Sequence, residues 1–344
     1  MNLCIQKTRY EASKMVVPNG AIVILSYPDT VVRPAHWEYL SRLWPLIGIG
    51  SKHAIQAGHA ALLLIENNNT EVNYYDFGRY ITSYGNGRLR SKETDPEILI
   101  PIKARFQNGR LTNLEELLLW LENHPEKTHG KGRLVASVNY SINYFKAKNF
   151  IDDLIKQKEI PYGAFIKKGS NCARFVTDTL INSCTNNKIR RKLKFSYLLT
   201  PSPIGNTLKG TTENTVYQVI NQKIKEYTNT SILKEYKSFF LNRHRIEPKL
   251  EGNELPNLKK FHLKTGTWLG GIGSGAWFNI EELIDHNRFK FARYKSNGEK
   301  DFEGYFISHD LHFNHKMEHQ FIHPSNCDEI YIKQNNSICY FKRL

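Results

Sequence analysis

Residues 58–66 read GHAALLLIE, and this stretch decides how the first half of the chain folds. Its apolar run predicts a buried β-strand that begins at His59 and ends at the turn signal NNN, residues 67–69. The chain then returns as EVNYYDFGRYI, residues 71–81, so we expect a hairpin. A strand of the same kind, AIVILSYP, precedes it at residues 21–28. The pattern predicts an antiparallel sheet with a histidine at the start of a buried strand.

Further elements follow on both sides of this hairpin. The aromatic stretch HWEYLSRLW, residues 36–44, predicts a short helix, and YGNG at residues 84–87 predicts the turn of a second hairpin. The segment EILIPI, residues 97–102, indicates one more strand. After it the periodicity becomes helical: we expect helices that begin at Asn113, that run through residues 147–154, and that begin near residues 170–171.

The second half of the chain changes character twice. Residues 186–260 are rich in Lys, Asn and Thr, and the segment from Val216 to Leu241 predicts a helix, so we interpret this part as a helical linker. Past residue 261, several segments alternate apolar with polar residues between turns, which predicts a small antiparallel sheet or barrel. The predicted fold class is therefore α+β, with a first domain at 1–185, a linker at 186–260 and a β-rich domain at 261–344.

Composition bounds the class of protein. The chain has 344 residues and 12% aromatic residues, which argues for a folded protein with more than one domain. Its formal net charge of +15 favours an anionic partner such as nucleic acid, a membrane surface or an acidic substrate. The densest basic run, KIRRKLK at residues 188–194, is interpreted first as a solvated helical face and second as a binding patch. No nucleic-acid-binding motif accompanies it.

Cysteine usage and apolar runs indicate the compartment. The five cysteines are odd in number and scattered, which is unlike a disulfide scaffold and fits a reducing environment. The first residues lack the apolar stretch of a signal peptide, and no later window is long and apolar enough to span a bilayer. We therefore expect a cytoplasmic protein without a transmembrane segment, although bacterial effectors exported by other routes also carry no such signal.

One set of residues has the pattern of a thiol nucleophile with its base. Cys172 follows Ser170-Asn171 at a predicted helix start, where unpaired backbone N–H groups and the helix dipole favour a thiolate. His59, at the start of a buried strand, is held rigidly enough to act as its base. A third group must orient the imidazole, and the hairpin brings Asp76 roughly opposite His59. Glu71 is the alternative, but it lies nearer the turn, so Asp76 is preferred.

These elements resemble permuted relatives of the NlpC-like branch of papain-fold enzymes. That group includes YiiX-like hydrolases, lecithin:retinol acyltransferase-like proteins and PPPDE peptidases. The resemblance rests on AIVILSYP, Gly58-His59, Asp76 and Asn171-Cys172, which occur in the family's order. It covers roughly residues 19–184 and leaves the rest of the chain unexplained.

The resemblance implies a permuted papain-like domain and a cysteine hydrolase of the peptidase or amidase type. Cys172, His59 and Asp76 would form its triad and pass through an acyl-enzyme, and no cofactor is implied. Its substrate would carry an acyl group in a peptide, an isopeptide, or a lipid amide or ester. Two alternatives stay open: a thiol acyltransferase, and a non-catalytic protein on the same fold that binds an anionic partner through its basic surface.

Two other motifs are interpreted as structural. The histidines at 309, 312, 315, 319 and 323 have spacings that can suit a metal, but their helical pattern is interrupted and a polar loop is favoured. The segment GGIGSG, residues 270–275, lacks the Lys-Ser/Thr of a phosphate-binding loop, so a glycine-rich bend in a sheet is expected. We therefore predict no metal site.

Overall fold

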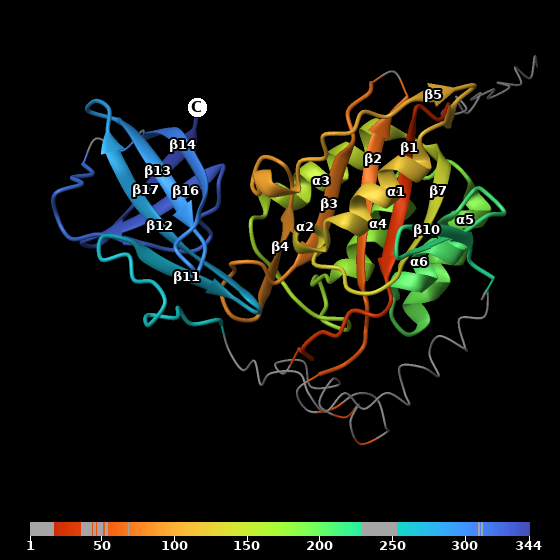
Figure 1. Ribbon diagram of the computed structural model, residues 1–344, viewed down its shortest axis with the longest axis horizontal. Helices are drawn as coiled ribbons and strands as arrows, with labels where there is room; N and C mark the ends of the chain where they lie inside the picture. The colour runs from red at the N-terminus through yellow and green to blue at the C-terminus, as the bar shows by residue number, and fades with distance from the viewer. Residues whose placement is uncertain are drawn as a thin grey trace, which may run out of the picture.

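The computed structural model has an N-terminal α+β domain and a C-terminal β domain that lie side by side (Figure 1). It describes residues 17–35, 43, 46, 51, 54–67, 69–228, 253–308, 310 and 312–344. The short helix expected at residues 36–44 falls almost entirely outside these residues. Among the residues that it describes, no helix is both long enough and apolar enough to cross a membrane.

The N-terminal domain is built on an antiparallel eight-stranded sheet with the order β10-β9-β7-β1-β2-β3-β4-β8. Its centre, β1 and β2, consists of apolar and largely β-branched or leucine residues that are buried on both faces. The strands are β1 Gly20–Tyr27, β2 His59–Glu66, β3 Asn73–Gly78, β4 Asn86–Arg90, β7 Leu134–Ile142, β8 Ile160–Pro161, β9 Tyr217–Ile220 and β10 Lys223–Glu226. A separate short hairpin joins β5 Phe106–Gln107 to β6 Arg110–Leu111.

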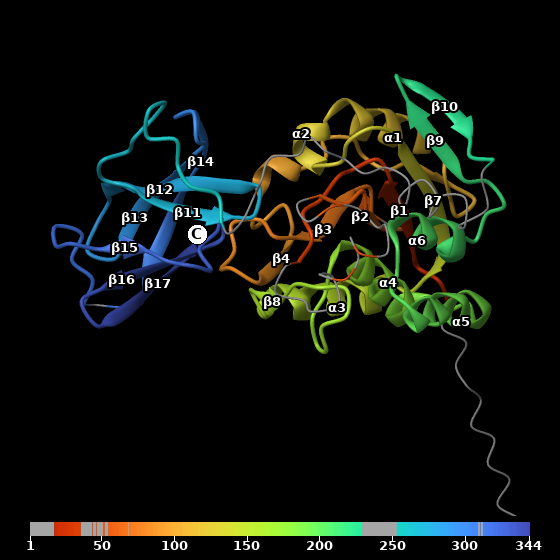
Figure 2. The same cartoon turned by 90° about the horizontal axis from the view of Figure 1, so that it is seen from below.

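Helices cover both faces of this sheet, so the domain has three layers (Figure 2). On one face α1, Leu114–Asn123, packs its leucines against alternate residues of β1, β2 and β7, and the short α2, Pro125–Thr128, follows it. On the other face lie α3 Tyr144–Lys156, α4 Cys172–Ser183, α5 Asn187–Lys194 and α6 Pro203–Gly210. The intervening residues of the strands, such as Ile22, Ile24 and Leu62, contact this second group of helices.

The C-terminal domain is one seven-stranded antiparallel sheet with the order β11-β12-β13-β14-β17-β16-β15. Its core is a cluster of phenylalanines, in which the rings of Phe321 and Phe341 each meet the ring of Phe291 edge to face. The two edge strands of this sheet, β11 and β15, lie close together: the Phe321 amide of β15 donates to Thr267 Oγ1 of β11 at 3.2 Å. The strands are β11 Thr267–Gly271, β12 Ser274–Leu283, β13 Arg288–Tyr294, β14 Lys300–Ser308, β15 Gln320–Phe321, β16 Glu329–Gln334 and β17 Ser337–Arg343.

The structure corrects two expectations about local structure. Residues 97–102 do not form a strand: the 3-10 helix η2, Pro96–Ile98, lies there, because Pro96 starts a tight turn and only Ile98 and Ile100 reach the core. The helix expected from Val216 to Leu241 is wrong over residues 217–226, which form the β9–β10 hairpin. Residues 229–241 lie outside the described part of the chain.

The segment 186–228 is also part of the first domain rather than a linker. Strand β9 hydrogen-bonds to β7, and Val219 is fully buried in the core beside α1. Helix α5 buries Ile189 and Leu193, the 3-10 helix η3, Phe195–Leu198, follows it, and α6 packs beside β1 and β7. The Lys- and Asn-rich composition of this segment concealed its place in the core. A surface helix needs an apolar residue only at every third or fourth position to bury one face.

A buried arginine joins the two domains. Arg293 of β13 donates to Asp301 of its own domain at 3.0 Å and to Glu97 of the first domain at 2.9 Å, and it lies 3.7 Å from Asp95. Its side chain is only 3% exposed. A guanidinium withdrawn from water needs such partners, so the contact fixes the domains to one another.

Replacing this arginine should weaken the structure. We expect Arg293→Leu to lower the free energy of unfolding by about 3 kcal/mol, because the partly buried carboxylates of Glu97 and Asp301 lose their cation and buried Asp95 keeps only Arg88. Arg288 is a matched control on the same strand, since its partner is Asp285 and its side chain is 52% exposed; Arg288→Leu should have a much smaller effect. Urea unfolding measures both, and equal losses would contradict the buried role of Arg293.

Candidate active site

The imidazole of His59 is placed by the way β2 begins. Gly58, directly before it, has φ +72°, and a Cβ there would lie 3.1 Å from the Tyr27 carbonyl oxygen and 3.2 Å from the Pro28 Cα. Glycine is therefore the residue that allows the chain to turn tightly into the strand. Tyr27, at the end of β1, pairs with His59 in register, and the two rings stack at 6.3 Å. Only 7% of His59 is exposed.

Asp76 of β3 contacts Nε2 of the His59 imidazole. Its register partner on β2 is Ala61, two residues beyond His59, so both side chains lie on the same face of the sheet. His59 Nε2 is 3.1 Å from Asp76 Oδ2. This contact leaves Nδ1 as the ring nitrogen available to another group.

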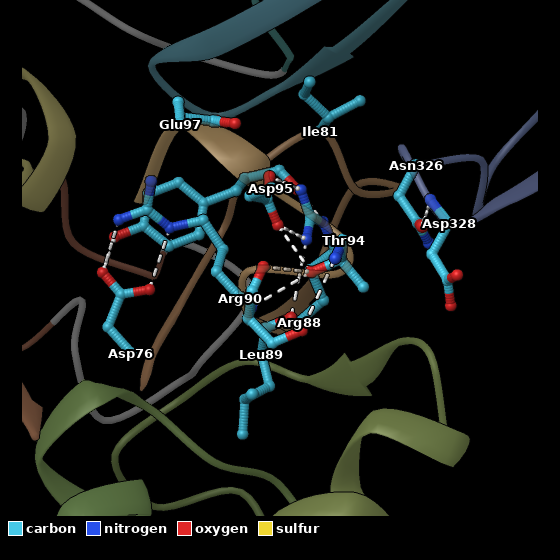
Figure 3. A network of polar contacts seen from close by, with 12 residues as sticks. Asp76, Ile81, Arg88, Leu89, Arg90, Thr94, Asp95, Glu97, Asn326 and Asp328 are labelled. Atoms are coloured by element: carbon cyan, nitrogen blue, oxygen red, sulfur yellow. Dashed lines mark hydrogen bonds and ion pairs between the residues drawn. The ribbon is translucent and has the colours of Figure 1, made fainter. Parts of the chain in front are cut away.

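The Asp76 carboxylate is fully buried and saturated with donors. Arg90 of β4 donates to both of its oxygens, at 2.9 Å from Nε and 2.6 Å from the terminal nitrogen, as Figure 3 shows. The hydroxyls of Tyr74 and Tyr80 donate to Oδ2 at 3.0 and 2.9 Å. Burial alone would raise the pKa of Asp76, but the charge and hydrogen bonds of Arg90, with those of His59, hold it well below its usual range. Asp76 is therefore an anion.

Cys172 is the first residue of α4, in the layer of helices that also contains α3 and α5. Asn171 caps the helix, because its side chain accepts from the Arg174 amide at 2.9 Å. The thiol therefore lies at the positive end of a helix dipole. It is 8% exposed, and it lies close enough to His59 to contribute to the raised pKa of that imidazole.

The charge state of His59 reflects these two neighbours. Burial disfavours the imidazolium and lowers the pKa, but the hydrogen bonds to Asp76 and Cys172 and the charges of both groups outweigh it and raise the pKa of His59 to about 9. A second histidine close by behaves in the opposite way: burial and the charge of Arg90 lower the pKa of His129 to about 3. The site thus contains one charged imidazole and one neutral one.

The structure brings Cys172, His59 and Asp76 together and leaves Glu71 apart. Glu71 is exposed beyond the end of β3 and forms an ion pair with Lys92. Sequence reasoning missed Arg90, Tyr74 and Tyr80, which surround Asp76. An arginine at alternate positions of the strand-like stretch NGRLR was an available signal, since a charged residue on the inner face of a strand needs a buried partner.

The histidine series and the glycine-rich segment both belong to the C-terminal domain. Among the described residues, no group of three or more His, Cys, Asp and Glu side chains is arranged to hold a metal ion, and His309 lies outside them. The segment GGIGSG forms the turn of the β11–β12 hairpin, with Gly273 at φ +73°. That is the glycine-rich bend that was expected.

Two parts of the chain match known family models. Residues 22–189 match the family model of type VI secretion system effectors described as TseH-like. Residues 266–344 match the model of the DUF6695 C-terminal domain.

One solved structure and the curated proteins complete the comparison. The crystal structure of the type VI secretion system effector TseH is 15% identical, with a TM-score of 0.40, over 61% of this chain and 98% of that chain. No curated protein sequence gives a significant match.

The raised pKa of His59 predicts a pH-dependent stability. Its value is about 9 in the folded chain and near 6.5 in an unfolded one, so the folded state binds the proton more tightly. This stabilisation is fully present below pH 6.5 and is lost as the pH rises through 9. The free energy of unfolding of the wild type, relative to His59→Gln, should fall by up to about 3 kcal/mol between pH 6 and 10.

Urea unfolding at several pH values measures this difference. Cys172→Ala should retain part of the pH dependence, because Asp76 still pairs with the imidazolium. A constant difference between wild type and His59→Gln across the range would show that His59 is neutral in the folded protein.

Proposed function

We propose that this protein is a cysteine-dependent amide hydrolase with Cys172 as nucleophile, His59 as general base and acid, and Asp76 as the group that orients His59. The observation that carries the proposal is a buried cysteine at the start of a capped helix, close to an imidazole whose Nε2 lies 3.1 Å from a buried carboxylate. In this arrangement His59 would use Nδ1 to exchange protons with Cys172 and the substrate, while Asp76 orients the ring.

The reaction would proceed in two halves. The Cys172 thiolate attacks the carbonyl carbon of an amide, and the proton on His59 Nδ1 passes to the leaving amine as the C–N bond breaks. A thioester remains on Cys172. His59 then removes a proton from water, hydroxide adds to the thioester, and the acid leaves as the thiolate returns.

The start of α4 is suited to the oxyanion of both tetrahedral intermediates. The backbone N–H groups of Cys172 and Ala173 lie in the first helical turn, where a helix offers them no acceptor. The next amide, that of Arg174, is already taken by the Asn171 side chain. The first two N–H groups are thus the donors that we assign to the oxyanion.

The match to the TseH-like family supports the further proposal that this hydrolase acts as a secreted effector. Its substrate would be an acyl compound joined through a peptide, isopeptide or lipid amide bond. If the acyl group on Cys172 passes to an added amine or alcohol in preference to water, the enzyme is an acyltransferase instead. Trapping the thioester and adding such acceptors separates the two.

Thiol reactivity provides the direct test. We expect iodoacetamide to alkylate Cys172 at least about tenfold faster than the other cysteines at pH 7, because the start of a helix and the neighbouring imidazole favour nucleophilic attack by its sulfur. Burial raises the pKa values of the Cys184, Cys327 and Cys339 thiols, so these three should react slowly. Peptide mass spectrometry measures the rate at each site.

Two variants give the control. His59→Ala should reduce the advantage of Cys172 towards the rate of an ordinary partly accessible thiol. His286→Ala is the control replacement, because His286 belongs to the C-terminal domain and its side chain is 80% exposed; it should leave the rate unchanged. Similar alkylation rates at all cysteines of the wild type would refute the proposed function.

A further inference from the structure

The turn of the β11–β12 hairpin contacts the segment Arg79–Ile81, which follows Asp76 in the chain. The amide of Ile272 donates to the Arg79 carbonyl at 3.0 Å, and the amide of Ile81 donates to Ser274 Oγ at 3.1 Å. A Cβ on Gly271 would lie 2.3 Å from the Ile81 nitrogen and 2.5 Å from the Arg79 oxygen. The glycine therefore allows two backbones from different domains to meet.

Ile81 anchors this contact in the core of the C-terminal domain. It is 8% exposed and packs in the cluster that includes Leu269, Ala276 and the phenylalanines of the β sheet. Its φ is +42°, a region that costs a β-branched residue on the order of 1–3 kcal/mol. Strain of this size persists where the surroundings hold the residue in place, and here most of those surroundings belong to the other domain.

Tyr80, between the two anchored residues, faces the opposite way. Its hydroxyl donates to Asp76 Oδ2 at 2.9 Å, and its ring lies 4.0 Å from the guanidinium carbon of Arg90. Its carbonyl accepts from Arg88 Nε at 2.8 Å. The backbone on both sides of Tyr80 is thus bound by the C-terminal domain, while its side chain belongs to the candidate active site.

A chain of buried polar contacts also links the C-terminal domain to Tyr80. Arg88 donates to both oxygens of Asp95 at 2.6 and 2.7 Å, and Asp95 lies 3.7 Å from Arg293 of β13. Figure 3 shows the hydrogen bonds between Arg88, on the same strand as Arg90, and Asp95. The buried ion pairs of the domain interface therefore fix the arginine that holds the Tyr80 carbonyl.

We propose that the C-terminal β domain positions Tyr80 against Asp76, so that Tyr80 is a positioning residue of the hydrolase and the second domain completes its site. The proposal rests on the proposed function, because it assigns Tyr80 a role through the carboxylate that orients His59. It gives the DUF6695-like segment an intramolecular task.

The physical effect is on the charge of Asp76. Its Oδ2 is within hydrogen-bond distance of four donors, from His59, Tyr74, Tyr80 and Arg90. Each donor that competes with His59 reduces the pull of the carboxylate on the imidazolium. Loss of the Tyr80 hydroxyl should therefore raise the pKa of His59, by about half a unit for one neutral hydrogen bond.

The test is a double-mutant cycle in the full-length chain, read by the NMR titration of His59. Tyr80→Phe removes the hydroxyl, and Gly271→Ala adds a methyl group against Ile81 and Arg79. Each should raise the pKa of His59 by about half a unit, and the double variant should raise it no further, because both act through one hydrogen bond. Ser274→Ala, which removes only the acceptor of the Ile81 amide, should shift it in the same direction if Gly271→Ala does not fold.

The control is Gly273→Asn in the same turn, where a Cβ meets nothing within 4 Å and asparagine tolerates the φ of +73°; it should leave the pKa of His59 at the wild-type value. An unchanged pKa in both hairpin variants, or shifts that add in full to that of Tyr80→Phe, would overturn the proposal. Alkylation of Cys172 in the same samples separates the two proposals. A coupled pKa with an unreactive thiol would refute the hydrolase and retain the coupling between the domains.

Discussion

The buried ion pair between Asp76 and Arg90 is the constraint on which the rest of the site depends. Asp76 is 0% exposed and Arg90 1% exposed, at adjacent strands in direct register. A carboxylate removed from water needs a cation and several donors, and a single misplaced partner would leave an uncompensated charge. The register of β3 and β4 is therefore fixed by electrostatics as well as by the apolar pattern.

This pair also explains why the imidazole beside it can be charged although it is buried. Without an anion on its Nε2 side, desolvation would make His59 neutral, as it does His129. Arg90 keeps Asp76 ionised, and Asp76 in turn raises the pKa of His59. Arg90 thus stabilises the His59 imidazolium indirectly, through Asp76, even though Arg90 and His59 carry the same charge.

The sequence predicted the elements that local patterns encode. Strands β1 and β2, the hairpin to β3 and the helix that begins at Cys172 follow from apolar runs and a cap residue. Chain order also suggested that Cys172, His59 and Asp76 would meet, and the structure places them together. Tyr80 and Arg90 could not be predicted as neighbours of Asp76, because their orientation depends on the register of β3 against β4. The β9–β10 hairpin was missed because β9 pairs with the distant strand β7 and buries Val219 in the shared core, which a local pattern does not show.

The arrangement of the domains has a consequence for how such a site is stabilised. A loop that follows a strand of a candidate site would ordinarily be free to move, since loops make few buried contacts. Here the backbone of Arg79–Ile81 is held by hydrogen bonds to the Ile272 amide and the Ser274 hydroxyl, and the Ile81 side chain packs in the core of the C-terminal domain. Because interior packing has few alternative arrangements, this loop can move only if the β11–β12 hairpin breaks its contacts with Arg79–Ile81. The rigidity of the Asp76 environment is therefore a property of both domains together.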